Sequence, residues 1–116
     1  MRVSDEKEKY LEYYFENIHF MGGLEVGSIR IMAECKGQGA EYVSCSYDPD
    51  DEDYKEGYVT MFFWRPADDE DTMVFVENKD FFEYLLKVCQ DHILKCPEDE
   101  ERLMGYISTI KKDLNV

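Results

Sequence analysis

The sequence predicts a single α+β domain, in which about four helices cover a small antiparallel three-stranded meander. Three observations predict this class: apolar residues at helical spacing near both ends of the chain, strand-like segments in its middle, and a length of 116 residues, which suits one domain. Apolar residues make up 44% of the chain and aromatic residues 15%, which is enough for a core and too much for a disordered acidic segment. The expected order over residues 1–116 is α-α-β-β-β-α-α.

The first helix is expected from about Ser4 to Met21, with Ser4 or Asp5 as its cap and Gly22-Gly23 at its end. Its apolar face recurs at helical spacing. The residues on this face are Leu11, Tyr14, Phe15, Ile18 and Met21.

A second helix is expected from about Leu24 to Cys35, although Gly27 lowers its helix propensity. Gly37 and Gly39 then indicate a turn. The apolar face of this helix consists of Val26, Ile29, Met32 and Ala33.

Three strands are expected in the middle of the chain. Residues Tyr42 to Tyr47 alternate between apolar and polar side chains, as in a strand with one face in water. Tyr58 to Trp64 is apolar on both faces, which predicts a covered central strand. After a hairpin connection from Arg65 to Asp71, Met73 to Val76 returns as a short strand.

Two helices are expected at the C-terminal end. Asn78 caps the first, from about Lys79 to Cys96, and Pro97 takes the first position of the second. Acids from Glu98 to Glu101 suit the positive end of that helix. The inward residues of the first helix are Phe82, Leu85, Leu86, Cys89 and Ile93, and those of the second are Leu103, Tyr106, Ile107, Ile110 and Leu114.

Negative charge is concentrated in the centre of the chain. The net charge is −14, and the segment from Glu41 to Asp71 holds eleven acidic and only two basic residues. Carboxylates crowded in this way repel one another, and a positively charged partner would be their electrostatic complement. The acids form two clusters: Asp48, Asp50, Asp51, Glu52, Asp53 and Glu56, and then Asp68, Asp69, Glu70 and Asp71. Whether the two clusters share one face is left open by the order of the strands.

Composition argues against several classes of partner and location. Binding to nucleic acid or an anionic bilayer needs an excess of Lys and Arg, but this chain has 13 basic residues against 27 acidic ones. No run of eighteen apolar residues occurs, and the charged segment from Met1 to Tyr10 has no signal-peptide character. Cys89 and Cys96 lie about 10 Å apart on a predicted helix, too far for a disulfide. We therefore expect free thiols and a cytoplasmic location.

No residue pattern predicts catalysis, a cofactor or a specific metal site. The segment from Asp48 resembles a calcium loop only superficially, because Asp53 and Val59 occupy the positions where an EF-hand needs Gly and Glu. His19 and His92 fall on predicted helices and are expected to be partly exposed or capping residues. No nucleophile elbow, P-loop or dinucleotide fingerprint occurs.

Aromatic residues next to the acids point to protein binding. Tyr47, Tyr54 and Tyr58 flank the first cluster, and such residues beside charge are typical of interface hot spots. Trp64 precedes the second cluster, but we expect it to be buried against a helix.

Several short motifs resemble one protein family. They are Lys36-Gly37-Gln38-Gly39, Asp48-Pro49-Asp50-Asp51 and Glu56-Gly57-Tyr58-Val59, followed by Phe82-x-Tyr84-Leu85, Cys89 and Pro97-Glu98-Asp99. Over roughly residues 36 to 110, the chain resembles the small acidic immunity proteins that neutralise ribonuclease toxins of bacterial contact-dependent growth inhibition systems.

This resemblance implies a cytosolic protein without enzymatic activity that binds a cognate basic toxin domain and blocks its active site. The alternative hypotheses are an acidic adaptor or nucleic-acid mimic that binds a basic host or phage protein, and a small enzyme or metal-binding domain. The expected partner-binding residues are Asp48, Asp50, Asp51, Glu52, Asp53, Tyr54, Glu56, Tyr58, Asp68, Asp69, Glu70 and Asp71.

Overall fold

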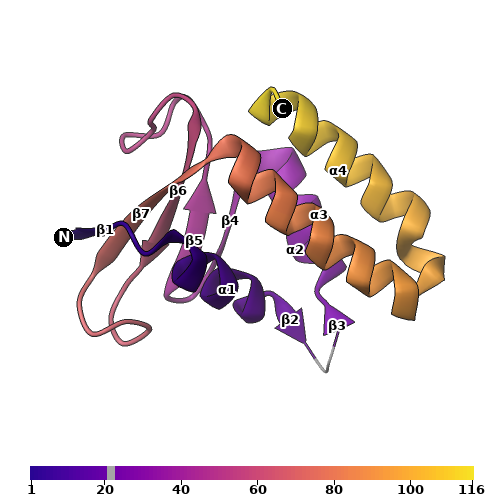
Figure 1. The fold of residues 1–116 in the computed structure, drawn as a ribbon, viewed down its shortest axis with the longest axis horizontal. Coiled ribbons are helices and arrows are strands. Elements are labelled where there is room, and N and C mark those ends of the chain that lie inside the picture. The colour runs from indigo at the N-terminus through magenta and orange to yellow at the C-terminus, as the bar shows by residue number, and fades with distance from the viewer. Residues whose placement is uncertain (21–22) are drawn as a thin grey trace.

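A five-stranded sheet carries its helices on one face in the computed structural model, which describes residues 1–20 and 23–116 (Figure 1). The spatial order of the strands is β1-β7-β6-β5-β4. β1 runs parallel to β7, and the other neighbours are antiparallel. The strands are β1 (Arg2–Ser4), β4 (Gly37–Ala40), β5 (Val43–Ser46), β6 (Tyr58–Phe63) and β7 (Thr72–Glu77), and a separate ribbon pairs β2 (His19–Phe20) with β3 (Gly23–Leu24).

Within the described residues, four α-helices form the second layer, which confirms the predicted α+β class. α1 and α3 contact the strands of the sheet, while α2 contacts the edge strand β4 and packs against α4. The helices are α1 (Lys7–Asn17), α2 (Val26–Cys35), α3 (Asn78–Lys95) and α4 (Glu100–Leu114), and a 3₁₀ turn η1 (Pro97–Asp99) precedes α4.

The core lies between the sheet and the helices. Val59, Met61 and Phe63 of β6 are fully buried, as expected for a central strand. Tyr14 of α1 and Phe81 of α3 belong to the same core cluster and are themselves fully buried. Side chains on the other face of the sheet stay outside this core cluster. They are Ser44, Ser46, Thr60, Phe62, Met73 and Phe75, which the strand register places opposite one another.

The prediction of a three-stranded sheet is wrong in the number of strands, because the sheet has five. β5, β6 and β7 do form the expected antiparallel meander, but β4 and β1 extend it on both sides. β4 was predicted as a turn because of Gly37 and Gly39. The side-chain-free backbone instead lies close against β5, since a Cβ on Gly37 would meet the carbonyl oxygen of Cys45 at 2.5 Å. The order α-α-β-β-β-α-α is corrected accordingly.

The N-terminal strand also shortens the first helix. α1 begins at Lys7 and ends at Asn17, and Ser4 belongs to β1, so neither predicted end is right. Pairing of Arg2 with Thr72 holds the first residues extended, and a helix cannot start at Ser4. The hydroxyl of Ser4 accepts a hydrogen bond from the N–H of Glu6 instead of capping the helix. The predicted end falls partly on Met21 and Gly22, which lie outside the described residues.

The C-terminal helices follow the prediction with two shifts. The inward face of α3 starts at Phe81, which is fully buried, whereas Phe82 is half-buried. Asn78 does not cap α3: its side-chain amide donates to the carbonyl of Leu114 and ties the start of α3 to the end of α4. Pro97 begins the 3₁₀ turn that precedes α4.

The close approach of β4 and β5 leads to a prediction. Replacing Gly37 with alanine should lower the free energy of unfolding by about 1–3 kcal/mol, because the new Cβ forces the two strands apart. Gly105→Ala is the matched control, since a Cβ there meets nothing within 4 Å and alanine suits a helix better by about 1 kcal/mol. Urea denaturation of both variants measures this difference. Equal stability of the two variants would contradict the argument.

Candidate functional site

The first acidic cluster lies in the loop that connects β5 to β6. We define the acidic loop as Asp48 to Glu56. Its backbone is folded by its own carboxylates: the N–H of Asp50 donates to Oδ1 of Asp48 at 3.0 Å, and the N–H of Asp53 donates to Oδ1 of Asp51 at 3.3 Å. The hydroxyl of Thr60 donates to the carbonyl of Asp53 at 3.1 Å. The loop is therefore anchored over the outer face of the sheet.

The charges of the acidic loop are not neutralised by the chain itself. All of its acids are exposed except Asp48, which is half-buried. Within the described residues, none of them forms an ion pair, although several ion pairs occur elsewhere. Like charges held this close to one another raise the electrostatic energy of the free protein, and a cationic surface would lower it.

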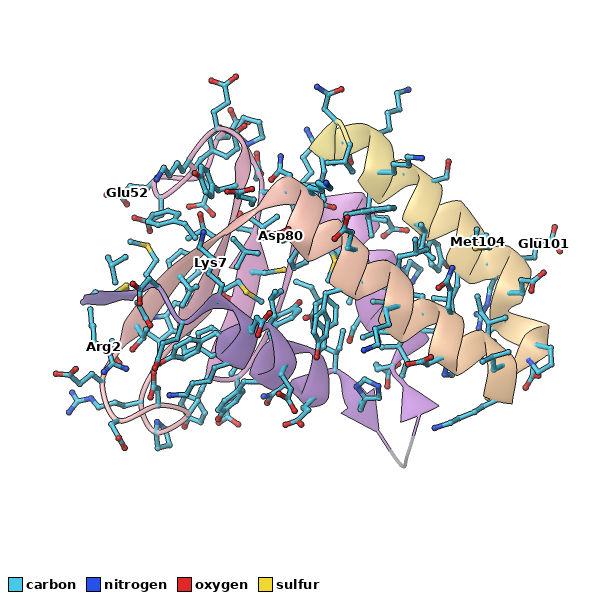
Figure 2. All side chains as sticks on the ribbon, in the orientation of Figure 1. Arg2, Lys7, Glu52, Asp80, Glu101 and Met104 are labelled. Carbon is cyan, nitrogen blue, oxygen red and sulfur yellow. The ribbon has the colours of Figure 1, made fainter. Side chains whose placement is uncertain are left out.

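The second acidic cluster lies at the opposite end of β6. β6 begins at Tyr58, directly after the acidic loop, and ends at Phe63, before Asp68 to Asp71. Six residues of strand separate the two clusters by about 20 Å. Figure 2 shows this separation through Glu52 in one loop and Arg2, the partner of Asp68, at the other end. The two clusters therefore do not form one continuous surface.

The chain compensates the second cluster with its own cations. Asp68 accepts hydrogen bonds from the Tyr10 hydroxyl at 2.7 Å and from Arg2 at 3.1 Å, and Arg2 also lies 3.4 Å from Glu70. Asp71 accepts a hydrogen bond from the backbone N–H of Arg65 at 2.9 Å. Asp69 is exposed. These contacts give the cluster a structural role, since they attach β1 to the β6–β7 connection.

The ionised form of Asp68 is favoured in the folded protein. Burial opposes its ionisation, but the hydrogen bond from Tyr10, that from the N–H of Asp69 and the positive charge of Arg2 outweigh burial and lower its pKa. A lowered pKa stabilises the fold above the ordinary aspartate pKa of about 4, and this contribution is lost as the pH falls through the folded-state value.

This ionisation predicts a pH-dependent variant. Asp68→Asn should lower the free energy of unfolding by about 1–2 kcal/mol near neutral pH, with the difference shrinking in acid, because the wild-type carboxylate is then protonated. Urea denaturation at neutral pH and at a series of acidic pH values, lowered until the carboxylate of Asp68 is protonated, measures it. Asp69→Asn, at an exposed position, is the control and should change little. A loss that does not depend on pH would show that Asp68 acts in its neutral form.

A hollow on the outer face of the sheet adjoins the acidic loop. We call it the sheet groove; its volume is about 520 Å³. Phe62 and Trp64 form one wall, with ring centroids 5.3 Å apart and planes only 4° from parallel. Trp64 is half-buried outside the core cluster, so the expectation that a helix buries it is wrong. Asp48, Asp51 and Asp53 line the other end of the same groove.

The predicted tyrosines face a different side of the acidic loop. Tyr54 is 37% exposed, and together with Glu56 and Tyr58 it borders a second hollow near the C-terminus. The ammonium group of Lys55 lies 4.4 Å from the ring centroid of Tyr58 and 5.0 Å from that of Phe75. The acidic loop thus has a side toward the sheet groove and a side toward the C-terminus.

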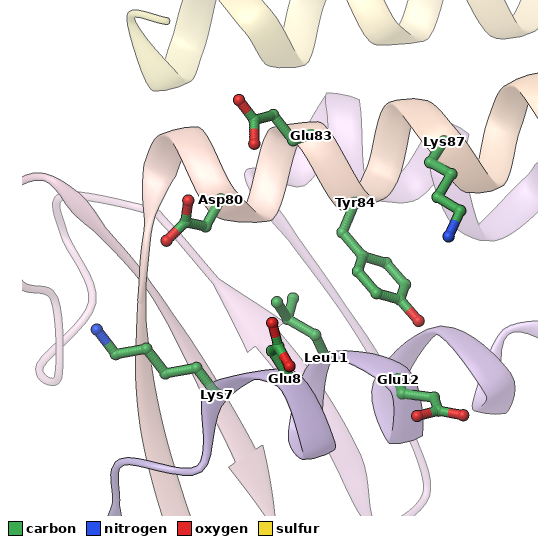
Figure 3. Close-up of a pocket in the computed structure, with 8 residues that line it drawn as sticks. All are labelled: Lys7, Glu8, Leu11, Glu12, Asp80, Glu83, Tyr84 and Lys87. Carbon is green, nitrogen blue, oxygen red and sulfur yellow. The ribbon is translucent and has the colours of Figure 1, made fainter.

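A further groove, of about 480 Å³, lies between α1 and α3. Figure 3 shows its lining: Lys7, Glu8, Leu11 and Glu12 come from α1, and Asp80, Glu83, Tyr84 and Lys87 come from α3. Lys7 and Lys87 lie at its two ends, so this groove mixes both signs of charge. Burial and the nearby charges of Glu12 and Glu16 raise the pKa of Tyr84. A cationic partner is matched less well here than at the acidic loop.

One group of side chains has the composition of a metal site. Among the described residues, His92, Cys96 and Asp99 bring three potential ligand atoms within 4.8 Å of one another. Both ring nitrogens of His92 are already used: Nδ1 accepts the N–H of Leu24 at 3.2 Å, and Nε2 lies 2.8 Å from Asp99. A metal on Nε2 would force the ring proton onto Nδ1, against the N–H of Leu24. The residues present therefore do not fit a metal ion.

The hydrogen bonds of His92 instead join three elements: α3, which carries His92, β3, which carries Leu24, and η1, which carries Asp99. His92 is only 7% exposed, which corrects the expectation of a partly exposed or capping histidine, and His19 lies in β2, not in a helix. Asp99 also accepts a hydrogen bond from Arg102 at 2.9 Å. The hydrogen bonds from His92 and Arg102 lower the pKa of Asp99. No local pattern in the sequence indicates this link, because Leu24 lies far from His92 in the chain.

Comparison with known proteins identifies the family. The model of the CDI immunity protein family, where CDI is contact-dependent growth inhibition, matches residues 7–107. The chain belongs to this family. No curated protein and no solved structure matches the chain.

Family membership confirms the resemblance found in the sequence motifs. The protein is an immunity protein that acts against a toxin and binds a cognate toxin partner, and its family is generally non-enzymatic. None of the described helices is both long and apolar enough to cross a membrane.

Proposed function

We propose that this protein neutralises a ribonuclease toxin by laying its acidic loop over the cationic active site of the toxin. One observation carries this proposal: within the described chain the carboxylates of the acidic loop form no ion pair, whereas Arg2 and Arg65 pair with Asp68, Glu70 and Asp71 of the second cluster. The proposed contacts are Asp48, Asp50, Asp51, Glu52, Asp53 and Glu56, with Tyr54 or Tyr58 as an aromatic anchor.

The chemistry of RNA cleavage supports this choice of partner. A ribonuclease binds phosphates with Lys and Arg, so its substrate cleft is positively charged. Carboxylates occupy the places of phosphates in such a cleft and exclude RNA from it. Complementary fields speed the encounter, and desolvated aromatic contacts slow dissociation. Charge alone would give a promiscuous complex, so specificity rests on shape and a few buried pairs.

The second cluster has a smaller part in this proposal. Asp68, Asp69, Glu70 and Asp71 lie about 20 Å from the acidic loop, at the other end of a six-residue strand. They would contact only a toxin domain that spans the whole outer face of the sheet. Asp69 and Glu70 are the exposed members and are the proposed contacts in that case.

The test is a titration with the purified toxin domain encoded beside this protein. Binding should be tight at low salt, weaken as salt rises, and stop RNA cleavage at equimolar concentration. Absence of binding at low salt would refute the proposed function. Binding to a toxin that does not cleave RNA would leave the immunity role and refute the ribonuclease assignment.

A further inference from the structure

We propose that the sheet groove receives an arginine-bearing segment of the toxin, with a guanidinium group stacked on Trp64 and neighbouring basic side chains facing Asp48, Asp51 and Asp53. This inference rests on the proposed function and adds the docking surface and its chemistry. Trp64 was not among the residues predicted to bind the partner.

The outer face of the sheet is open where the groove lies. Most of the helical layer lies on the opposite face (Figure 1), and Ile31 and Cys35 at the end of α2 line one side of the groove. The core cluster excludes Phe62 and Trp64, but Phe62 is only 7% exposed, so half-buried Trp64 is the ring that the groove leaves accessible. The groove is hollowed where Gly37, Gly39 and Ser44 line it, because these residues have no side chain or only a small one. A hollow with a planar aromatic wall is thereby left on the surface.

The aromatic wall is suited to a flat cation. The ring of Trp64 is stacked on that of Phe62, with planes only 4° from parallel, so Phe62, which is only 7% exposed, covers one face of the indole and holds its other face in a fixed orientation. Guanidinium groups stack on such faces, and tryptophan gives the strongest cation–π attraction of the aromatic side chains. An arginine also forms bidentate ion pairs with carboxylates, which lysine cannot do.

Aromatic rings near the acidic loop already hold cations, because both Lys7 and Lys55 lie over the ring of Tyr58. Lys55 lies over Tyr58 and Phe75, which the strand register places on the same face as Phe62. In the part of the chain that the structure describes, no lysine or arginine lies over the rings of Phe62 or Trp64. The chain therefore places its own cation on one aromatic pair and leaves the partly exposed ring of Trp64 without one.

Charge complementarity selects the toxin as the occupant. Three carboxylates line the far end of the groove, and none of them has an ion-pair partner within the described residues. An anionic or purely apolar segment would leave these charges without a partner when the groove is covered. A segment with several positive charges fits both ends of the groove.

Three variants of Trp64 test the inference by calorimetric titration with the toxin domain. Trp64→Ala should weaken binding about tenfold or more, as expected for a central aromatic anchor. Trp64→Phe should retain most of the affinity, because a ring remains. Trp64→Leu should lose as much as Trp64→Ala if the ring holds a cation. Leu94→Ala, at an 83% exposed position on α3, is the control and should bind as wild type does.

A spectroscopic measurement on the unmutated sequence completes the test. Trp64 is the only tryptophan of the chain, so 5-fluorotryptophan labelling gives one fluorine resonance that reports on the groove. This resonance should shift when unlabelled toxin is added. If wild type binds but the resonance does not move, or if Trp64→Leu binds normally, the inference fails while the proposed function stands. If wild type does not bind, the proposed function itself fails.

Discussion

Reversing Asp50, Asp51 and Asp53 to lysine should weaken toxin binding at least tenfold and leave the fold intact. Tenfold corresponds to about 1.4 kcal/mol, a modest demand for three charges that change from attraction to repulsion. All three side chains are exposed and lie in a loop outside the core, so the core does not depend on them, and the variant loses only the hydrogen bond that Oδ1 of Asp51 accepts within the loop. Titration calorimetry measures the affinity, and thermal denaturation checks the fold.

The control for this variant changes the net charge by the same amount elsewhere. Glu12, Glu16 and Glu83 are exposed acids on α1 and α3, away from the acidic loop. Their reversal to lysine should weaken binding much less, and most of that loss should disappear at high salt. Equal losses in both triple variants would mean that the overall charge, and not the acidic loop, attracts the toxin. Unchanged affinity in the loop variant would remove the loop from the site.

Replacing Phe81 with alanine should cost about 3–5 kcal/mol of stability, the largest loss expected from a single substitution in this article. Phe81 is fully buried, and its ring centroid lies 5.6 Å from that of Phe15 and 6.5 Å from that of Tyr14. A loss of this size is a large fraction of the stability of an ordinary domain, about 5–15 kcal/mol. Urea denaturation measures it.

Phe82→Ala is the natural comparison, because it removes the same side chain one position along α3. Phe82 is half-buried and packs only against the edge of the core. Its loss should therefore be clearly smaller than that of Phe81. The opposite ranking would mean that α3 is rotated and presents the face that the sequence pattern predicted.

Local patterns predicted the elements that rest on local physics. The alternation in β5, the apolar character of β6 and the stripe on α4 each follow from burial of one or both faces, and the buried residues confirm them. The α+β class with four helices followed from these same patterns. Phe81 and Phe82 were confused because adjacent phenylalanines at a helix start fit the helical period equally well.

Features that depend on distant partners could not be predicted. β1 exists because Arg2 pairs with Thr72, seventy residues away. β4 was hidden because glycine is typical of turns, whereas here Gly37 permits close contact with β5. The sequence showed the excess of acids, but only the structure separates the acidic loop from the second cluster, in which Arg2 pairs with Asp68 and Glu70.

The candidate site likewise has a part that local sequence patterns predicted, the acidic loop, and a part that depends on distant residues, the sheet groove. Trp64 was expected against a helix because large aromatic side chains are usually buried. Its place on the outer face follows from the strand register, in which Phe62 lies opposite Met73 and Ser44. The sheet groove therefore combines residues from α2, β4, β5, β6 and the acidic loop that no sequence motif brings together.

Amide hydrogen exchange of the free protein and of its complex with the toxin domain tests the central claim most directly. Exposed loops exchange fast in a free protein, so a bound partner gives a clear change. We expect slower exchange in peptides that cover Asp48 to Tyr58 and Trp64, and no change in α4. Protection confined to α1 and α3, along the groove of Figure 3, with none in the acidic loop, would contradict the account.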